Sequence, residues 1–213
     1  MHLIPIHANL KEVEEYLERQ GLTGGRALHI GAGDSAVELL WSASLNREIT
    51  LTDRDKGKLS RIAGFITEYL PWMELNSEVE PSKPGVSLEQ AMEALRSLRR
   101  HWRLKPDRRI ITRRINIAVI DILREQANLN RLRGKYDFIF AFGYTNILHR
   151  REGRIGRFIG NIKLLLRPGG KAILSDILPM GTVARTLSRL PCTRQIGENT
   201  IVIEAGHMGT TLF

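Results

Sequence analysis

The chain has 213 residues, and its 32 Lys and Arg residues outnumber 23 Asp and Glu residues to give a formal net charge of +9. This length suits one domain with a sizeable core, and the single cysteine excludes an internal disulfide framework and fits a reducing compartment. No stretch approaches about 18 uncharged apolar residues, and the first residues lack the basic-then-apolar order of a secretory signal. We therefore expect a soluble cytoplasmic protein without a membrane span.

The excess positive charge lies in one segment, Arg96–Arg114. It holds nine of the Lys and Arg residues and one acidic residue, which leaves 23 basic and 22 acidic residues in the rest of the chain. The segment either binds RNA or another polyanion, with Trp102 available for stacking, or forms a solvated helix face. In the second case it pairs with acidic residues elsewhere, such as Glu78, Glu80 and Glu89.

The chain is predicted to begin with an arm and a helix, which together span residues 1–24. Asn9 is a typical N-cap residue, and apolar residues that include Leu10 and Leu17 recur at helical spacing after it. Gly21 is a typical residue at the end of a helix.

A strand, a glycine turn and a helix are predicted next. The apolar run Ala27–Ile30 fits a buried parallel strand, and Gly31-Ala32-Gly33 follows it, where the chain must turn sharply and allow a ligand to come close. Ser35 and Glu38 form a capping-box pattern, so a helix should begin there with free N–H groups that favour an anionic ligand group.

The second strand of this unit ends in an acidic residue. Ile49–Thr52 is predicted to be a strand, and Asp53 follows it about 20 residues beyond the glycines. At that distance a carboxylate can accept hydrogen bonds from the two hydroxyls of a ribose. Together with the glycine turn, Asp53 predicts half of a nucleoside-cofactor site.

A long connection, residues 71–109, separates the next helix from the third strand. The helix before it begins at Asp55 and is stopped by Pro71, and residues 72–85 are predicted to form a loop. Ser87 and Gln90 form a capping box for a helix that runs through Trp102.

The rest of the chain alternates strands and helices and ends in a hairpin. The expected elements are a strand within Ile110–Ile120 that runs out at Asp121, a helical turn or two in Leu123–Leu132, a strand Tyr136–Phe142, a helix Gly153–Leu166, a strand Lys171–Ser175, a helix Val183–Leu190, and hairpin strands Thr193–Ile196 and Thr200–Glu204. This order predicts a single α/β domain, residues 1–213, with a Rossmann-like, doubly wound, mostly parallel sheet, an antiparallel C-terminal strand, an N-terminal helix and a helical insert.

With these elements placed, residues 25–204 resemble the class I S-adenosylmethionine-dependent methyltransferases. The segments that carry the resemblance are ALHIGAGDS for the glycine loop, LTDRD for the ribose-binding strand end, VIDI for the acid beside the adenine, YDFIFAFGYTNILH for the fourth-strand motif and LLLRPGGKAIL for the approach to the fifth strand. LLRPGG is the most specific of these. The long insert and TDRDKGKL are loosely similar to the nicotinamide and phenylethanolamine N-methyltransferases.

The resemblance implies S-adenosylmethionine as the cofactor. It implies that the loop from Gly31 through Ala32 to Gly33 approaches the methionine part and that Asp53 binds the ribose. His29 stands where the family usually has an acid that helps to order this loop. The remaining implied cofactor contacts are Arg54, Asp121 and Ile122 around the adenine, and Phe142 and Gly143 after the fourth strand.

Methyl transfer from a sulfonium is an in-line displacement in which charge is lost, so a dry, aligned pocket supplies much of the rate and a metal is unnecessary. Tyr144 and His149 are the candidate bases, with His7 a further candidate if the arm covers the site, and Asn146 is placed to orient an acceptor. A lone His or Tyr near a strand end is also a common structural feature.

The acceptor is predicted to be a small molecule, because the chain has neither an Asn-Pro-Pro-Tyr motif nor a Pro-Cys nucleophile after the fourth strand. One alternative is an RNA methyltransferase that uses Arg96–Arg114. Another is a nicotinamide-dependent enzyme, since residues 31–36 also fit G-x-G-x-x-A. A third is a methyltransferase fold retained as a binding module.

Overall fold

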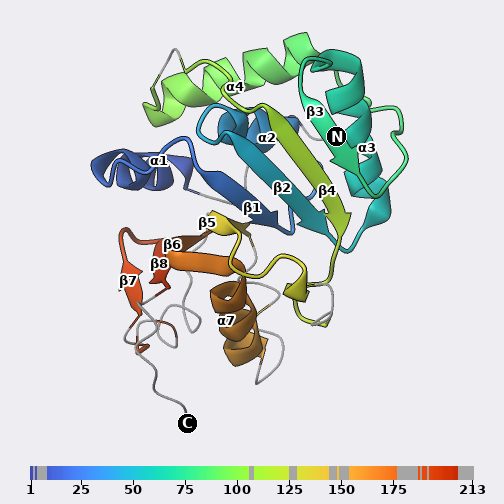
Figure 1. Ribbon diagram of the computed structural model, residues 1–213. Coiled ribbons are helices and arrows are strands. Elements are labelled where there is room, and N and C mark those ends of the chain that lie inside the picture. Colours follow the sequence, from blue (N-terminus) through green and yellow to red (C-terminus); the bar gives the residue numbers. More distant parts are fainter. Residues whose placement is uncertain are drawn as a thin grey trace.

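The structure is a computed structural model of the chain. It describes all residues except 2, 4–8, 106–107, 125–128, 144–147, 149–153, 177–186, 188, 191 and 206–213. In the described part of the chain, eight strands form one sheet in the order β3-β4-β2-β1-β5-β6-β8-β7 (Figure 1). The strands are β1 (Arg26–Ile30), β2 (Glu48–Asp53), β3 (Glu74–Ser77), β4 (Arg114–Val119), β5 (Tyr136–Phe142), β6 (Leu166–Ser175), β7 (Thr193–Gln195) and β8 (Thr200–Glu204).

Helices cover both faces of this sheet. Figure 1 shows α2, α3 and α4 on one side and α7 on the other. The helices with described bounds are α1 (Leu10–Arg19), α2 (Ala36–Ala43), α3 (Lys56–Tyr69), α4 (Leu88–Trp102) and α7 (Arg154–Leu165). Among the described residues, no helix has the length and apolar character that a membrane crossing requires.

The predicted sheet is confirmed. Strands β3, β4, β2, β1, β5 and β6 pair in parallel, whereas β8 pairs antiparallel with both β6 and β7. The hairpin strands at residues 193–195 and 200–204 lie within the predicted ranges. The fold is therefore a doubly wound α/β sheet whose parallel strands all end at one edge.

Two predictions about strands need correction. The segment 72–85 was predicted to be a loop, but Glu74–Ser77 is a strand that pairs in parallel with β4 at the edge of the sheet. Leu75 is its one apolar residue and the strand is short, so the sequence shows no clear apolar alternation, and its pairing with β4 stabilises it. Strand β6 begins at Leu166 rather than at Lys171, with an irregular register between Tyr136 and Phe138 of β5.

Local capping explains where four of the helices begin. The Asn9 side chain accepts a hydrogen bond from the Glu12 N–H at 3.4 Å, and that of Ser35 accepts one from the Glu38 N–H at 3.2 Å. Asp55 caps α3 in the same way, and Ser87 with Gln90 forms both bonds of a capping box at the start of α4. Each cap satisfies N–H groups that the helix itself leaves unpaired, and all four starts are confirmed.

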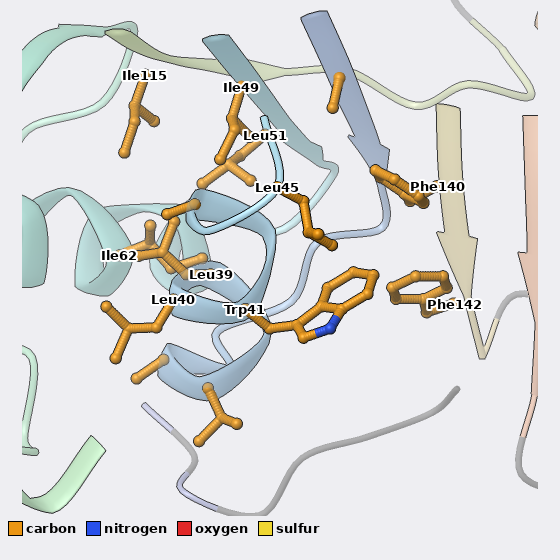
Figure 2. Close-up of a cluster of buried hydrophobic side chains, with 14 of the residues drawn as sticks. Leu39, Leu40, Trp41, Leu45, Ile49, Leu51, Ile62, Ile115, Phe140 and Phe142 are labelled. Carbon is orange, nitrogen blue, oxygen red and sulfur yellow. The ribbon is translucent and has the colours of Figure 1, made fainter. Parts of the chain in front are cut away.

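The largest apolar cluster lies between the sheet and helices α1 to α4. Figure 2 shows Trp41 of α2 at its centre, with its ring beside Phe140 and Phe142 of β5. The Trp41 side chain is fully buried, and its indole Nε1–H donates to a carboxylate oxygen of Glu14 at 3.0 Å. This cluster fixes the position of α2 against the sheet. Because the glycine turn leads directly into α2, the cluster also fixes the end of the turn. A second cluster packs α7 against the opposite face.

Candidate functional site

The parallel sheet brings the predicted cofactor residues to one edge, because parallel strands end together. The backbone is linked across that edge by hydrogen bonds between neighbouring strand ends: Ala32 N–H to Thr52 O at 2.9 Å, Ile120 N–H to Asp53 O at 3.1 Å, and Gly143 N–H to Ser175 O at 3.0 Å. The segments that follow β1, β2, β4, β5 and β6 therefore form one continuous row.

The glycine turn after β1 has the backbone that its sequence predicts. Gly31 and Gly33 have φ values of 65° and 60°, in the left-handed region that glycine adopts without steric cost. A Cβ added to Gly33 would meet no atom within 4 Å. Gly33 is therefore required by its backbone conformation and not by a neighbouring group, and no protein atom fills the space where its Cβ would stand.

Asp53 lies directly against this turn. Its Oδ2 accepts a hydrogen bond from the Gly33 N–H at 3.0 Å, and its Oδ1 accepts one from the Asp55 N–H at 2.9 Å. The side chain is half-buried, whereas the neighbouring Arg54 is exposed. A carboxylate fixed in this way keeps lone pairs available for further donors, since each oxygen accepts about two hydrogen bonds.

An adenosyl cofactor fits these residues. The open main chain of the turn lets a ligand approach without meeting a Cβ, and the Asp53 carboxylate is the kind of acceptor that a ribose diol requires. Among the described residues, no group of three or more His, Cys, Asp or Glu side chains is placed to hold a metal ion.

His29 does not share this open surface. Its side chain is 4% exposed, its Nε2 lies 2.7 Å from the Ser42 Oγ of α2, and its ring centroid lies 4.9 Å from that of Phe140. Burial in this apolar environment lowers the pKa of His29 from 6.5 to about 3, so the imidazole is neutral. His29, which was predicted to contact the cofactor, thus lies in the core between α2 and β5.

Asp121 and Ile122 follow β4 with their side chains in different environments. The Asp121 Oδ1 accepts a hydrogen bond from the Leu123 N–H at 3.0 Å, and its Oδ2 lies 3.6 Å from the Nε of Arg124. The Ile122 side chain is buried in the cluster around α7, and its carbonyl accepts a bond from the Asn161 side chain at 2.5 Å. The carboxylate of Asp121 therefore stays half-buried at the strand edge, while Ile122 anchors the segment.

The end of β5 places Phe142 and Gly143 beside this row. Phe142 is buried, with its ring edge-on to that of His29, and Gly143 turns the chain with a φ of 62°. The predicted base candidates Tyr144, His149 and His7, and the acceptor-orienting Asn146, lie outside the described residues. Their roles remain predictions.

Two hydrogen-bonded contacts that the sequence did not predict fix the segments on either side of the site. Asp34 follows the glycine turn, is buried, and its Oδ2 accepts hydrogen bonds from the Arg61 Nε and Nη2 at 2.9 and 2.7 Å, which ties the turn to α3. At the other end, the Asn9 N–H donates to the Ser175 Oγ at 2.9 Å, which ties the start of α1 to the end of β6. No sequence spacing links the members of either pair.

A pocket of about 400 Å³ lies between the start of α1, the end of α4 and the turn that joins β7 to β8. Its lining includes Asn9, Lys11, His101, Trp102 and Asn199. This volume is within the range of small-molecule pockets in proteins. The sequence did not predict the pocket, because its lining residues come from segments far apart in the chain.

The basic segment 96–114 pairs largely with acidic residues of its own chain. The partners differ from the predicted Glu78, Glu80 and Glu89. The ion pairs are Arg96 and Arg100 with Glu93 at 3.1 and 3.3 Å, Lys105 with Glu18 at 3.1 Å, Arg108 with Glu14 and Glu18, and Arg114 with Glu74 at 2.9 Å. Arg99 is buried and donates to the Ser44 Oγ at 3.2 Å. Among the described residues, five of the nine cations of the segment are therefore paired, with four carboxylates.

No protein-family model matches the chain, and no curated protein matches it. Solved structures do match. A putative S-adenosylmethionine-dependent methyltransferase from Methanococcus maripaludis has a TM-score of 0.51 at 14% identity, over 95% of this chain and 88% of that one. The N-methyltransferase NodS from Bradyrhizobium japonicum has a TM-score of 0.49 at 13% identity, over 93% and 97% of the two chains.

A third match, a structure that concerns the conversion of a disulfide bond into a thioacetal during echinomycin biosynthesis, has a TM-score of 0.39 at 17% identity. It covers 84% of this chain, which spans only 54% of that longer protein. The chain has the fold of the class I S-adenosylmethionine-dependent methyltransferases. S-adenosylmethionine is the cofactor to be expected with this fold.

Proposed function

We propose that the protein is an S-adenosylmethionine-dependent methyltransferase that acts on a small-molecule acceptor. The proposal is carried by the Asp53 carboxylate, which the Gly33 N–H holds at 3.0 Å against a glycine turn that is open to a ligand. In this proposal Asp53 accepts the ribose hydroxyls and the turn faces the methionine part. Arg54 flanks the adenine and Asp121 accepts from its amino group, whereas the predicted contact of Ile122 with the ring is not retained, because its side chain is buried in the cluster around α7.

The acceptor is proposed to react beside the end of β5. S-adenosylmethionine would supply a methyl group on a sulfonium: a lone pair of the acceptor would form a bond to the methyl carbon, in line with the C–S bond that breaks, and the electrons of the broken bond would pass to sulfur. Phe142 is buried there and excludes water from its side of the site, and Gly143 turns the chain with a φ of 62°. We assign the removal of a proton from the acceptor to Tyr144 or His149, on the sequence pattern alone.

A small acceptor is favoured over RNA by the local pairing of the basic segment. RNA binding depends on cations that can replace the counterions of phosphates, and two cations of this segment, Arg99 and Arg108, are instead largely buried and bond within the fold. Within the described residues, Arg103, Arg109 and Arg113 form no ion pair, so they are the residues on which an RNA methyltransferase would depend.

The test is a calorimetric titration of the purified chain with S-adenosylmethionine, and a parallel titration with NADH. We expect binding of S-adenosylmethionine with a Kd in the micromolar range, as is common for enzyme substrates, and no heat from NADH. Transfer of labelled methyl groups to small-molecule pools but not to total RNA completes the assignment. A chain that binds no S-adenosylmethionine contradicts the proposal. Methylated RNA, lost in an Arg103→Gln and Arg109→Gln variant, contradicts the choice of acceptor.

A further inference from the structure

The pocket between α1, α4 and the β7–β8 turn lies next to the carboxyl end of β6. Two of its lining residues form hydrogen bonds to that strand end, which neighbours the end of β5 where the acceptor is proposed to react. The main-chain N–H of Asn9 donates to the Ser175 Oγ at 2.9 Å, and the carbonyl of Asn199 accepts from the Asp176 N–H at 3.0 Å. Ser175 is the last residue of β6 and lies opposite Phe142 of β5. Two lining residues are therefore fixed directly to the carboxyl end of β6.

The described lining of this pocket combines one aromatic ring with cationic and neutral polar groups. Trp102 is the last residue of α4 and is half-buried. Part of its side chain packs against the core cluster, and this packing fixes the position of the indole ring. Lys11 and His101 contribute nitrogen donors, and Asn9 and Asn199 contribute amides. No carboxylate is among the described lining residues.

Lys11 is the cation best placed to meet a ligand. Its ammonium group lies 3.9 Å from the Glu15 carboxylate, with both side chains about half exposed, and an exposed pair at i,i+4 on a helix is worth little. Binding an anion at Lys11 therefore costs little in lost pairing. The sign of charge in the pocket favours an anionic ligand group, and the flat indole face favours a planar one.

We propose that this pocket binds the methyl acceptor, and that the acceptor joins a flat aromatic or conjugated group, stacked on Trp102, to a carboxylate or phosphate paired with Lys11. This inference rests on the proposed methyltransferase function and names the acceptor class for that site. A volume of about 400 Å³ accommodates a molecule of one or two rings. A polynucleotide would instead need a row of cations, whereas Lys11 is the one lysine or arginine among the described lining residues.

The experiment is a ligand-observed NMR titration of the full chain, with S-adenosylmethionine present, against three probes. The probes are 2-aminobenzoate, phenyl phosphate and the uncharged 2-aminobenzamide. We expect both anions to bind at least tenfold more tightly than the amide, because a hydrogen bond to a charged group is about twice as strong as a neutral one. The stronger anion identifies the carboxylate or phosphate class.

Matched variants separate the pocket from the rest of the surface. Lys11→Gln should remove the preference for the anions, whereas Lys163→Gln, an exposed lysine on α7, should leave it unchanged. Trp102→Phe should weaken all three probes by about threefold to tenfold, and Trp72→Phe, at a side chain that is 63% exposed, should have no effect. None of the four changes should shift the S-adenosylmethionine Kd by more than about twofold.

Failure of S-adenosylmethionine to bind overturns the proposed function, and the probe titrations alone then decide whether the pocket is an anion site. Binding of S-adenosylmethionine with equal affinity for the anions and the amide, or with a preference that survives Lys11→Gln, overturns the inference about the acceptor and leaves the methyltransferase assignment intact. Displacement of phenyl phosphate by a short RNA, lost in Lys11→Gln, also overturns it, in favour of a nucleic-acid acceptor.

Discussion

The carboxylate of Asp53 accepts a hydrogen bond from the main-chain N–H of Gly33 at 3.0 Å, so the end of β2 is fixed to the glycine turn after β1. The same carboxylate accepts the Asp55 N–H at 2.9 Å, at the start of α3. One side chain thus positions both the turn and the start of α3.

Replacing Asp53 by Asn tests whether its charge binds the cofactor. We expect Asp53→Asn to weaken S-adenosylmethionine about tenfold to a hundredfold, since a hydrogen bond to a charged group is worth roughly 1.5 to 3 kcal/mol. Calorimetric titration measures the change. Asp55→Asn is the control, because Asp55 is exposed and caps α3, and its affinity should stay close to that of the wild type. Equal affinities for all three proteins would exclude Asp53 from the site.

Gly33→Ala separates backbone strain from obstruction of a ligand. The residue has a φ of 60°, which costs an L-amino acid about 1 to 2 kcal/mol, and the added methyl group meets no protein atom within 4 Å. We therefore expect a loss of about 1 to 2 kcal/mol in the free energy of unfolding, measured in urea, and a loss of S-adenosylmethionine affinity well beyond tenfold.

Gly21→Ala is the matched control for this change. Gly21 has a φ of 64° and equally open space around its Cα, but it lies before β1, whereas the glycine turn follows β1. The variant should lose similar stability and keep its affinity for S-adenosylmethionine. If both variants lose affinity equally, the effect is strain and the turn does not contact the ligand.

Capping residues and the glycine-to-acid spacing could be predicted because they are local. Ser87 and Gln90 bond to each other's backbone, so their spacing alone predicts the capping box. Gly33 follows β1 and Asp53 ends the neighbouring parallel strand β2, so their spacing places them at the same edge of the sheet. Pairs made by packing could not be predicted. Arg61 reaches Asp34 only because α3 lies across the glycine turn, and no spacing in the sequence encodes that contact.

Strand β3 and the partners of the basic segment were missed for the same reason. The residues Glu74–Ser77 include a single apolar side chain, Leu75, and they form a strand because the edge of β4 offers hydrogen-bond partners. Glu14 and Glu18 meet Lys105 and Arg108 because the segment after α4 packs against α1. Composition revealed the excess charge, but the tertiary packing determined where it is neutralised.

His29 should make the stability of the protein depend on pH below neutrality. Its pKa is lowered from 6.5 to about 3 by burial, so between these values the unfolded chain binds a proton that the folded chain does not. The stability that the neutral imidazole contributes is complete above pH 6.5 and is lost as the pH falls toward 3. Between pH 7 and pH 5 this loss amounts to about 2 kcal/mol.

The measurement is urea unfolding at pH 7, 6 and 5 for the wild type and His29→Gln, a side chain that can still bond to Ser42 without titrating. The variant should lose clearly less stability than the wild type over this range. His101→Gln, at an exposed histidine on α4, should follow the wild type. Parallel pH profiles for all three proteins would mean that the buried ring does not take up a proton on unfolding.

The Asp34–Arg61 pair should stabilise the glycine turn more than an exposed ion pair would. The Asp34 side chain is 3% exposed and accepts two hydrogen bonds from Arg61, whose side chain is 38% exposed, while the amino group of Met1 lies 3.8 Å away. Because solvent screens Arg61 in part, we expect Arg61→Gln to lower the free energy of unfolding by about 1 to 3 kcal/mol. Asp34→Asn should cost less, because it leaves no buried charge behind.

A double-mutant cycle in urea measures the coupling energy between the Asp34 and Arg61 side chains, which should exceed about 1 kcal/mol. Each single variant should also bind S-adenosylmethionine more weakly. A coupling near zero would show that the turn keeps its shape without α3.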